Sequence, residues 1–174
     1  MQVLNLARAV INIYMTTVSC VFLPSHIPSN LTQTKIIVAL KKAMSEWNRT
    51  MAGLVEFKYG YGELQCRIFF DGTIDKQKYP TRVAECRDKK GPGNWDIVLD
   101  INTKWHTGGF FARFCSKKIP LITTLLHEIG HIMDLPHSTN PDDIMHGEFQ
   151  SQTKISLKEM YKYRQFFIAR EKNK

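Results

Sequence analysis

The residues best suited to chemistry lie together in one short segment, His127-Glu128-Ile129-Gly130-His131. Two histidines four positions apart project from the same face of a helix, so both imidazoles can meet one metal ion. His137 follows six positions after His131 and supplies a third imidazole. Three neutral imidazoles leave one position of a tetrahedral zinc ion open, as is typical of a catalytic site. The spacing therefore predicts one Zn2+ ion held by His127, His131 and His137.

Glu128 follows the first predicted ligand and is offset around the helix, so its carboxylate can address a metal-activated water instead of the metal. A carboxylate in that place can take the proton of the water and return it to a leaving amine. The predicted chemistry is hydrolysis of peptide bonds in a protein or peptide substrate, with Glu128 as the catalytic residue. A zinc-holding module without activity is the alternative, and the intact Glu128 argues against it.

Three helices are predicted around this segment. Pro120 suits the first turn of the helix that carries the histidine pair. An earlier helix begins after a cap at Asn30 or Thr32, and a later one runs from about Ser156 to Arg170. Spacings of three and four residues give the expected buried faces: Ile36, Ile37, Leu40, Ala43, Met44 and Trp47 in the earlier helix, Leu121, Leu125, Ile129 and Ile132 in the middle one, and Leu157, Met160, Tyr161, Phe166 and Phe167 in the later one.

Short strands are predicted at Leu54–Tyr59, Cys66–Phe70 and Trp95–Ile101. Between the last two, residues 71–94 hold glycines, prolines and many charges, which predicts a long surface loop. The first apolar stretch has two interpretations that the sequence leaves open. Residues 1–19 are either a signal peptide, with residues 20–174 as the domain, or an N-terminal strand extension within a buried strand at Val10–Leu23.

The length of 174 residues fits a single domain, and no apolar stretch is continuous enough to predict a membrane span. Of the net charge of +8, residues 154–174 carry +5, while Arg113, Lys117 and Lys118 add +3. A basic patch at residues 154–174 could bind nucleic acid. Aromatic and basic residues do not interleave as in single-stranded nucleic-acid modules, so no nucleic-acid partner is expected, and we expect a monomer.

The four cysteines contain no CxxC pair, which excludes a cysteine zinc ribbon. They permit three full disulfide pairings, of which we favour Cys66 with Cys86 because both flank the same predicted loop. Two glycosylation triplets, at Asn30 and Asn48, together with the signal-peptide interpretation favour a secreted protein.

The segment His137-Ser-Thr-Asn-Pro-Asp-Asp-Ile-Met145, read with the histidine pair, resembles the matrixins, a branch of the metzincin zinc peptidases. The resemblance spans roughly residues 20–168 and implies an α+β fold, with a twisted mixed sheet and three helices. It implies that Met145 forms an apolar floor under the imidazoles. It also implies that Gly147 and Phe149 border a pocket for an apolar substrate residue, and that peptide lies along an edge strand near Trp95–Asn102.

Three departures from the matrixin pattern bear on these expectations. Asp134 replaces the signature glycine, at a turn where a left-handed residue would be needed. The segment 71–94 has no histidine, so the second, structural zinc ion of matrixins is not expected. Asp100 and Asn102 keep only part of a calcium-binding pattern, which leaves Ca2+ open.

Overall fold

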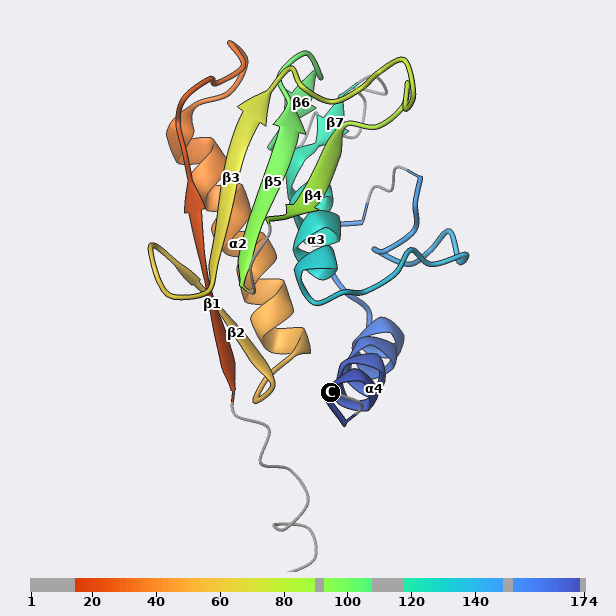
Figure 1. Ribbon diagram of the computed structural model, residues 1–174. Coiled ribbons are helices and arrows are strands. Elements are labelled where there is room, and N and C mark those ends of the chain that lie inside the picture. Colours follow the sequence, from red (N-terminus) through yellow and green to blue (C-terminus); the bar gives the residue numbers. More distant parts are fainter. Residues whose placement is uncertain (1–14, 90–92, 108–117, 149–151, 173–174) are drawn as a thin grey trace, which may run out of the picture.

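The computed structural model describes residues 15–89, 93–107, 118–148 and 152–172. Its main sheet has the strand order β2-β1-β3-β5-β4 (Figure 1). Strand β1 pairs in parallel with β2 and β3, β3 pairs in parallel with β5, and β4 pairs antiparallel with β5. The bounds are β1 Thr16–Phe22, β2 Val55–Tyr59, β3 Gln65–Asp71, β4 Ala84–Asp88 and β5 Asn94–Asp100, and a small second sheet joins β6 Trp105–His106 to β7 Ile119–Pro120.

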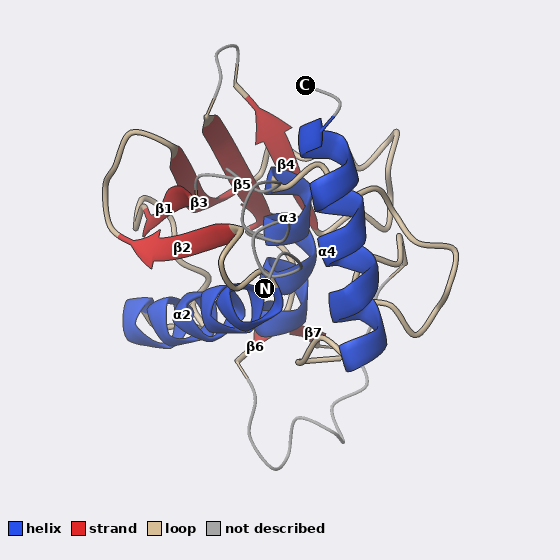
Figure 2. Cartoon of the chain, turned by 90° about the horizontal axis from the view of Figure 1, so that it is seen from below, coloured by secondary structure: helices blue, strands red, loops and turns tan. Residues whose placement is uncertain are grey.

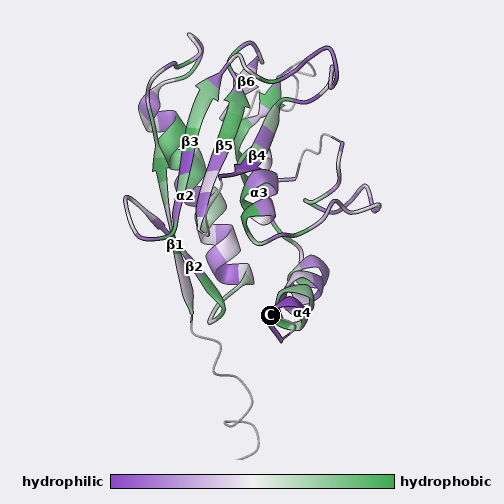
Figure 3. Ribbon diagram, viewed as in Figure 1, coloured by the Kyte–Doolittle hydropathy of each residue, from purple (hydrophilic) through white to green (hydrophobic). Residues whose placement is uncertain are grey.

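Three helices accompany the sheet within the described residues: α2 Gln33–Thr50, α3 Leu121–Ile132 and α4 Leu157–Lys172. Helices α2 and α3 lie on the same face of the sheet, and α4 lies beyond α3 (Figure 2). Apolar residues follow the central strands and the inner helix faces (Figure 3). The core between these layers is anchored by fully buried Trp47, Phe70 and Leu125. This architecture confirms the predicted α+β fold, with a mixed sheet and three helices.

Helix α2 supports α3 from behind. Thr32 caps α2 by accepting a hydrogen bond from the Lys35 backbone N–H, as predicted for one of the two candidate caps. Trp47 of α2 donates its indole N–H to the carbonyl oxygen of Leu126, at 2.9 Å. That carbonyl belongs to the residue directly before His127. The two helices are therefore joined at the turn that begins the histidine segment.

The predicted strands are found within one or two residues of their expected bounds, but the edge of the sheet is not where we expected it. Strand β5, from Asn94 to Asp100, lies between β3 and β4 and is an inner strand. The edge is β4, Ala84–Asp88, inside the segment that we predicted to be a loop. The expectation of an edge near Trp95–Asn102 came from the resemblance. In this inner strand Arg67 and Lys89 pair with the buried carboxylate of Asp96.

The favoured disulfide is also wrong. Cys66 lies on β3 and Cys86 on β4, with β5 between them, and both are free thiols. Neighbouring strands are about 4.8 Å apart, so cysteines two strands apart exceed the Cα separation of about 7 Å that a disulfide can bridge. Cys66 faces Cys20 on β1 instead. Cys115 lies outside the described residues.

Helix α4 buries only part of the predicted face, in which Met160 is partly buried against the core as expected. Phe167 is buried as expected, but Leu157 and Tyr161 are 73% and 69% exposed, and Phe166 is 38% exposed. Glu159 and Tyr163 are buried in their place. At the other end of the chain, residues Thr16–Phe22 form β1, with Val18–Phe22 buried. No helix in the described ranges is both long and apolar enough to cross a membrane.

Candidate functional site

The three histidines of the predicted metal site meet at one point. His127 and His131 lie one turn apart on α3, and His137 lies in residues 133–147, here called the lower segment, which follows the helix. The Nε2 atom of His127 lies 3.1 Å from that of His131 and 3.1 Å from that of His137, and the last two are 3.2 Å apart. Nitrogens bound to one tetrahedral zinc ion lie roughly 3.3 Å apart. The described residues hold no other group of three converging ligand side chains.

Backbone carbonyls determine which ring nitrogens of the first two histidines are free. The Nδ1 of His127 is 2.9 Å from the carbonyl oxygen of Ile144, and the Nδ1 of His131 is 2.9 Å from that of Leu135. A carbonyl oxygen only accepts, so both Nδ1 atoms must donate and both neutral rings present an unprotonated Nε2. Two bare nitrogens cannot bond to each other. Their approach fits a cation placed between them.

Burial favours the neutral form of these rings. It lowers the pKa of His127 to about 4, with further lowering by His131 and His137, while the Ile144 hydrogen bond opposes the shift. Burial also lowers the pKa of His131, against the hydrogen bond with Leu135. Metal ligation requires neutral imidazole, so the site is suited to bind a metal at and below neutral pH.

A left-handed turn ends α3 and leads the chain from the second histidine to the third. Asp134 has φ 57°. Its backbone N–H donates to the backbone carbonyl oxygen of His131 at 2.9 Å, and the Leu135 N–H donates to the carbonyl oxygen of Gly130 at 3.3 Å. These two bonds form a Schellman motif, in which the position of Asp134 is usually taken by glycine. The expected left-handed turn at Asp134 is therefore confirmed.

Glu128 lies beside the three histidines and is buried. Burial raises the pKa of its carboxyl to about 8; Arg82 and the backbone of Cys86 act against this shift, while Glu85 adds to it. Its Oε2 atom is buried without a hydrogen-bond partner among the described residues. Buried polar atoms nearly always have a partner. An unmet Oε2 next to three converging nitrogens fits a bound water or substrate group at this point.

Met145 packs against α3 at Gly130 and is fully buried. A Cβ atom added to Gly130 would lie 2.3 Å from the Met145 Sδ and 3.1 Å from a ring carbon of Trp47. The Met145 side chain therefore occupies the space that a side chain at position 130 would need. Within the lower segment, the backbone N–H of Ser138 donates to the carbonyl oxygen of Met145 at 2.7 Å, which joins the residue after His137 to Met145.

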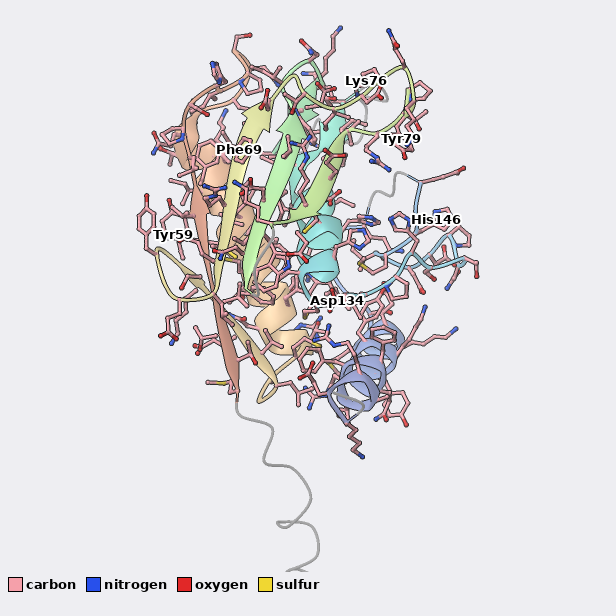
Figure 4. The ribbon with its side chains drawn as sticks, in the orientation of Figure 1. Tyr59, Phe69, Lys76, Tyr79, Asp134 and His146 are labelled. Atoms are coloured by element: carbon pink, nitrogen blue, oxygen red, sulfur yellow. The ribbon has the colours of Figure 1, made fainter. Side chains whose placement is uncertain are left out.

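A cleft of about 1140 Å³ opens over the histidines. The segment between β3 and β4, residues 72–83, is here called the upper segment. One wall of the cleft is formed by β4 and part of the upper segment. Tyr79 of the upper segment lines one side of the cleft and His146 of the lower segment lines the other (Figure 4). The opposite wall comprises α3 and the lower segment, including Thr123, Thr124, Ile144 and Gly147. In the described part of the sheet, the outer edge of β4 is unpaired and borders this cleft.

The remaining predicted residues divide between the cleft and other places. Gly147 lines the cleft and packs on His137, where an added Cβ would lie 3.3 Å from its Nδ1. Phe149 lies outside the described residues. Asp100 does not fit a calcium site, because Lys76 Nζ lies 2.8 Å from its Oδ2 and Asn102 offers its backbone N–H to Oδ1. A lysine ammonium holds the position that a cation would need.

Several residues that shape the site were not found from the sequence. The carbonyls of Leu135 and Ile144 orient the imidazoles, and backbone atoms carry no residue-type signal. Glu159 of α4 accepts the Ile144 N–H at 2.6 Å, although its place in the sequence reads as solvent-facing. The alternation of apolar and polar residues in Ala84-Glu85-Cys86 was the available signal for β4, but three residues are too few to predict a strand.

Comparison with protein-family models matches residues 14–162 of the chain to the matrixin family. A search of curated proteins gave no match. The matched range covers most of the chain, from just before β1 to within α4, and includes all three histidines and Met145. Together with the mixed sheet, the three helices and the histidine cluster, this match shows that the chain belongs to the matrixin family.

Proposed function

We propose that this protein is a zinc-dependent endopeptidase. In this proposal His127, His131 and His137 hold one Zn2+ ion, and Glu128 is the general base. The observation that carries it is the convergence of three imidazole nitrogens, two of them oriented by backbone carbonyls, beside the buried Oε2 of Glu128. Membership of the matrixin family supports peptide bonds as the substrate.

The residues divide the work of hydrolysis between them. A bound zinc ion supplies a Lewis acid that polarises the scissile carbonyl and acidifies a water. Glu128 Oε2 accepts a proton from the attacking water and returns it to the leaving amine. A carboxyl whose pKa burial has raised is a stronger base than an exposed one, so it takes the proton of the water more readily and still holds it near neutral pH for the leaving amine. Met145 supports the imidazoles from below as an apolar floor.

Peptide substrate is proposed to extend along the outer edge of β4, Ala84–Asp88, as an added strand. This replaces our expectation for Trp95–Asn102, because the edge strand is β4. The residue after the scissile bond would enter the part of the cleft near Thr123, Thr124 and Gly147. Both threonine hydroxyls donate to backbone carbonyls, of Gln152 and Pro120, so their protons are already used.

We therefore expect a preference for medium or large apolar residues just after the cleaved bond. An apolar pocket separates such residues by only about 1–3 kcal/mol, so Leu, Met, Ile and Phe should all be accepted. Mapping of cut sites in a peptide library, with and without a zinc chelator, tests activity and specificity together. A dominant charged residue or glycine at that position would contradict the pocket assignment.

The role of Glu128 is tested by Glu128→Gln. This variant keeps the shape of the side chain but removes the proton acceptor, so zinc content should stay near one ion per chain while cleavage falls by at least about 100-fold. His137→Ala is the comparison variant, and it should lose both zinc and cleavage. Cleavage by Glu128→Gln within tenfold of the parent would overturn the general-base assignment.

The basic patch at residues 154–174 supports a nucleic-acid partner less well than its charge implies. Arg164 donates to backbone carbonyls of Thr50 and Ala52, Lys162 pairs with Asp143, and Arg170 pairs with Asp134. These cations are used inside the molecule. A salt-titrated binding assay with duplex and single-stranded DNA tests the point, since phosphate contacts weaken steeply with salt.

Secretion is part of the proposal and rests on the family and on the sequence. Expression in a secretory host followed by sequencing of the exported N-terminus tests it, and retention inside the cell would contradict it. We do not expect a glycan at Asn48, because its side-chain amide exchanges two hydrogen bonds with the backbone of Phe57.

A further inference from the structure

The turn at the end of α3 contains an unfavourable residue. Asp134 has φ 57°, and no other non-glycine residue in the described ranges has a positive φ. A side chain in this conformation brings Cβ close to the following carbonyl oxygen, which glycine avoids. A carboxylate just past the C-terminus of a helix also meets the negative end of the helix dipole. Asp134 therefore carries two disadvantages that glycine would not.

One arginine of α4 contacts this turn directly. Arg170 Nη1 lies 2.5 Å from Asp134 Oδ2 and 2.6 Å from the carbonyl oxygen of Met133. Its guanidinium group also stacks on Phe167, at 4.9 Å from the ring centroid, and pairs with Glu171. In Figure 4, Asp134 is at the end of α3 that faces α4. The arginine side chain is only 22% exposed, whereas that of Asp134 is 67% exposed. The arginine is thus the fixed partner.

The contact offsets both disadvantages of Asp134. A cation near the C-terminus of a helix is favourable, and it neutralises the carboxylate there. The Met133 carbonyl, one of the terminal carbonyls of the helix, gains a donor. The pair also restricts the Asp134 side chain, which fixes the left-handed backbone from outside the turn.

The same turn positions the proposed metal ligands. The carbonyl of Leu135, directly after Asp134, accepts the Nδ1 proton of His131 at 2.9 Å. The chain then continues through Pro136 to His137. A shift of the turn would therefore rotate one imidazole and displace another.

We propose that Arg170 is a positioning residue for the metal site. From α4 it stabilises the left-handed turn at position 134, which glycine would adopt without such support. The inference rests on the zinc site of the proposed function. Arg170 lies beyond residue 162, where the match to the matrixin family ends. Arg170 contacts no substrate and acts through Asp134 and Leu135.

A double-mutant cycle on the full chain tests the proposal. The variants are Arg170→Ala, Asp134→Gly and the two combined. Arg164→Ala is the matched control, because it removes an arginine of the same helix that binds the carbonyls of Thr50 and Ala52, away from the turn. The readout is the dissociation constant for Zn2+, measured by competition with a chelating dye. The absorption spectrum of the Co2+-substituted protein reports ligand geometry independently.

Arg170→Ala should weaken zinc binding about three- to tenfold and change the Co2+ spectrum. Arg164→Ala should lower the melting temperature but leave the zinc constant within twofold. Asp134→Gly should be tolerated, and the combined variant should bind zinc within twofold of Asp134→Gly alone, because glycine needs no outside support. If Arg170→Ala does not fold, the combined variant should fold.

Three results would overturn the inference: an unchanged zinc constant in Arg170→Ala, an equal loss in Arg164→Ala, or the same loss with glycine at position 134. Failure of both Arg170→Ala and the combined variant to fold would also overturn it. A parent chain that binds no zinc would overturn the metal site and this inference together. The expected zinc pattern without any peptide cleavage would overturn only the proposed activity.

Discussion

Two irregular segments border the cleft, and they are held in place in different ways. The upper segment, residues 72–83, is held by Lys76, whose ammonium group lies 2.8 Å from Asp100 Oδ2 and 2.5 Å from the carbonyl oxygen of Arg82. Buried Ile74 adds an apolar contact. The lysine side chain is 41% exposed. The upper segment thus depends on a contact that water can reach.

The lower segment, residues 133–147, is held by buried polar groups. Glu159 of α4 is 2% exposed and accepts hydrogen bonds from the Ile144 and Ser156 backbones and the Tyr163 hydroxyl. Asp143 is 5% exposed and accepts from Ser138, Asn140 and Lys162. The segment that carries His137 and orients His127 therefore has the more protected contacts. The upper segment, which lines the cleft but holds none of the proposed ligands, is held more weakly and should open at lower free energy.

Glu159→Ala should have the largest effect and would break the lower segment. It leaves the donors of Ile144, Ser156 and Tyr163 without their acceptor. A buried donor that loses its acceptor costs about 1–3 kcal/mol. We expect the free energy of unfolding to fall by about 3–5 kcal/mol, with loss of zinc binding. Urea unfolding of the metal-free chain measures the first effect.

The control for this variant is Glu46→Gln, which breaks an ion pair with Arg49 on the surface of α2. An exposed pair of this kind contributes about 0–1 kcal/mol, so the change should be small. If Glu159→Ala costs no more than Glu46→Gln, the lower segment does not depend on its buried contacts.

The pH dependence of the metal-free chain should separate the site from the upper segment. The folded chain keeps His127 neutral down to a pKa of about 4, below its ordinary value of 6.5, so stability falls as pH drops from 6.5 to 4, by at most about 3 kcal/mol. Glu128 has the opposite sign, because its raised pKa of about 8 makes stability rise as pH drops from 8 towards 4.5.

Glu128→Gln resolves the two contributions. The metal-free variant should be more stable than the metal-free parent at pH 8, and the difference should vanish by about pH 4.5. At the end of β5, where Lys76 of the upper segment binds Asp100, burial raises the pKa of the Asp100 carboxyl, but Lys76, Asn102 and Thr103 outweigh burial and the pKa is lowered. Its contribution is lost only as pH falls below the ordinary carboxyl range, about 4. Equal stability of the metal-free Glu128→Gln variant and the metal-free parent at pH 8 would contradict the raised pKa of Glu128.

Lys76→Met should have the smallest effect and would sharpen the comparison. The half-exposed ion pair with Asp100 contributes about 1 kcal/mol after screening by water. Zinc binding should stay within twofold of the parent, while KM for peptide rises more than kcat falls, because only the covering wall is loosened. Lys58→Met, which removes an exposed pair with Glu56, is the control. A zinc loss as large as that of Glu159→Ala would show that both segments support the ligands.

Local patterns were enough to predict the parts of this protein whose positions depend on apolar spacing. The histidine pair and the buried faces of α2 and α3 follow from intervals of three and four residues, and β3 and β5 from short apolar runs. These elements bury side chains that sequence alone marks as apolar. The third histidine was predicted from its place six positions after His131 and not from a helix pattern, because it lies in an irregular segment.

The wrongly predicted face of α4 has its cause in a polar side chain that is buried through specific partners. Glu159 turns α4 so that Leu157 and Tyr161 face water, since its carboxylate binds the Ile144 backbone. Asp96, which alternation along the strand would place towards water, is likewise buried through its pairing with Arg67 and Lys89. Ile144 lies 15 residues from Glu159 in the chain, and Arg67 lies 29 residues from Asp96. Hydrophobic periodicity carries no information about such partners.

Gly130 and Met145 have a consequence for how this sequence can vary. They are far apart along the chain but share one volume, because a methyl group at position 130 would collide with the Met145 sulfur. Glycine costs about 1 kcal/mol relative to alanine in a helix interior, so alanine at position 130 would be favoured if that volume were free. The two positions should therefore covary. A library that randomises both should recover glycine with a long residue, or alanine with a shorter one, and few other combinations.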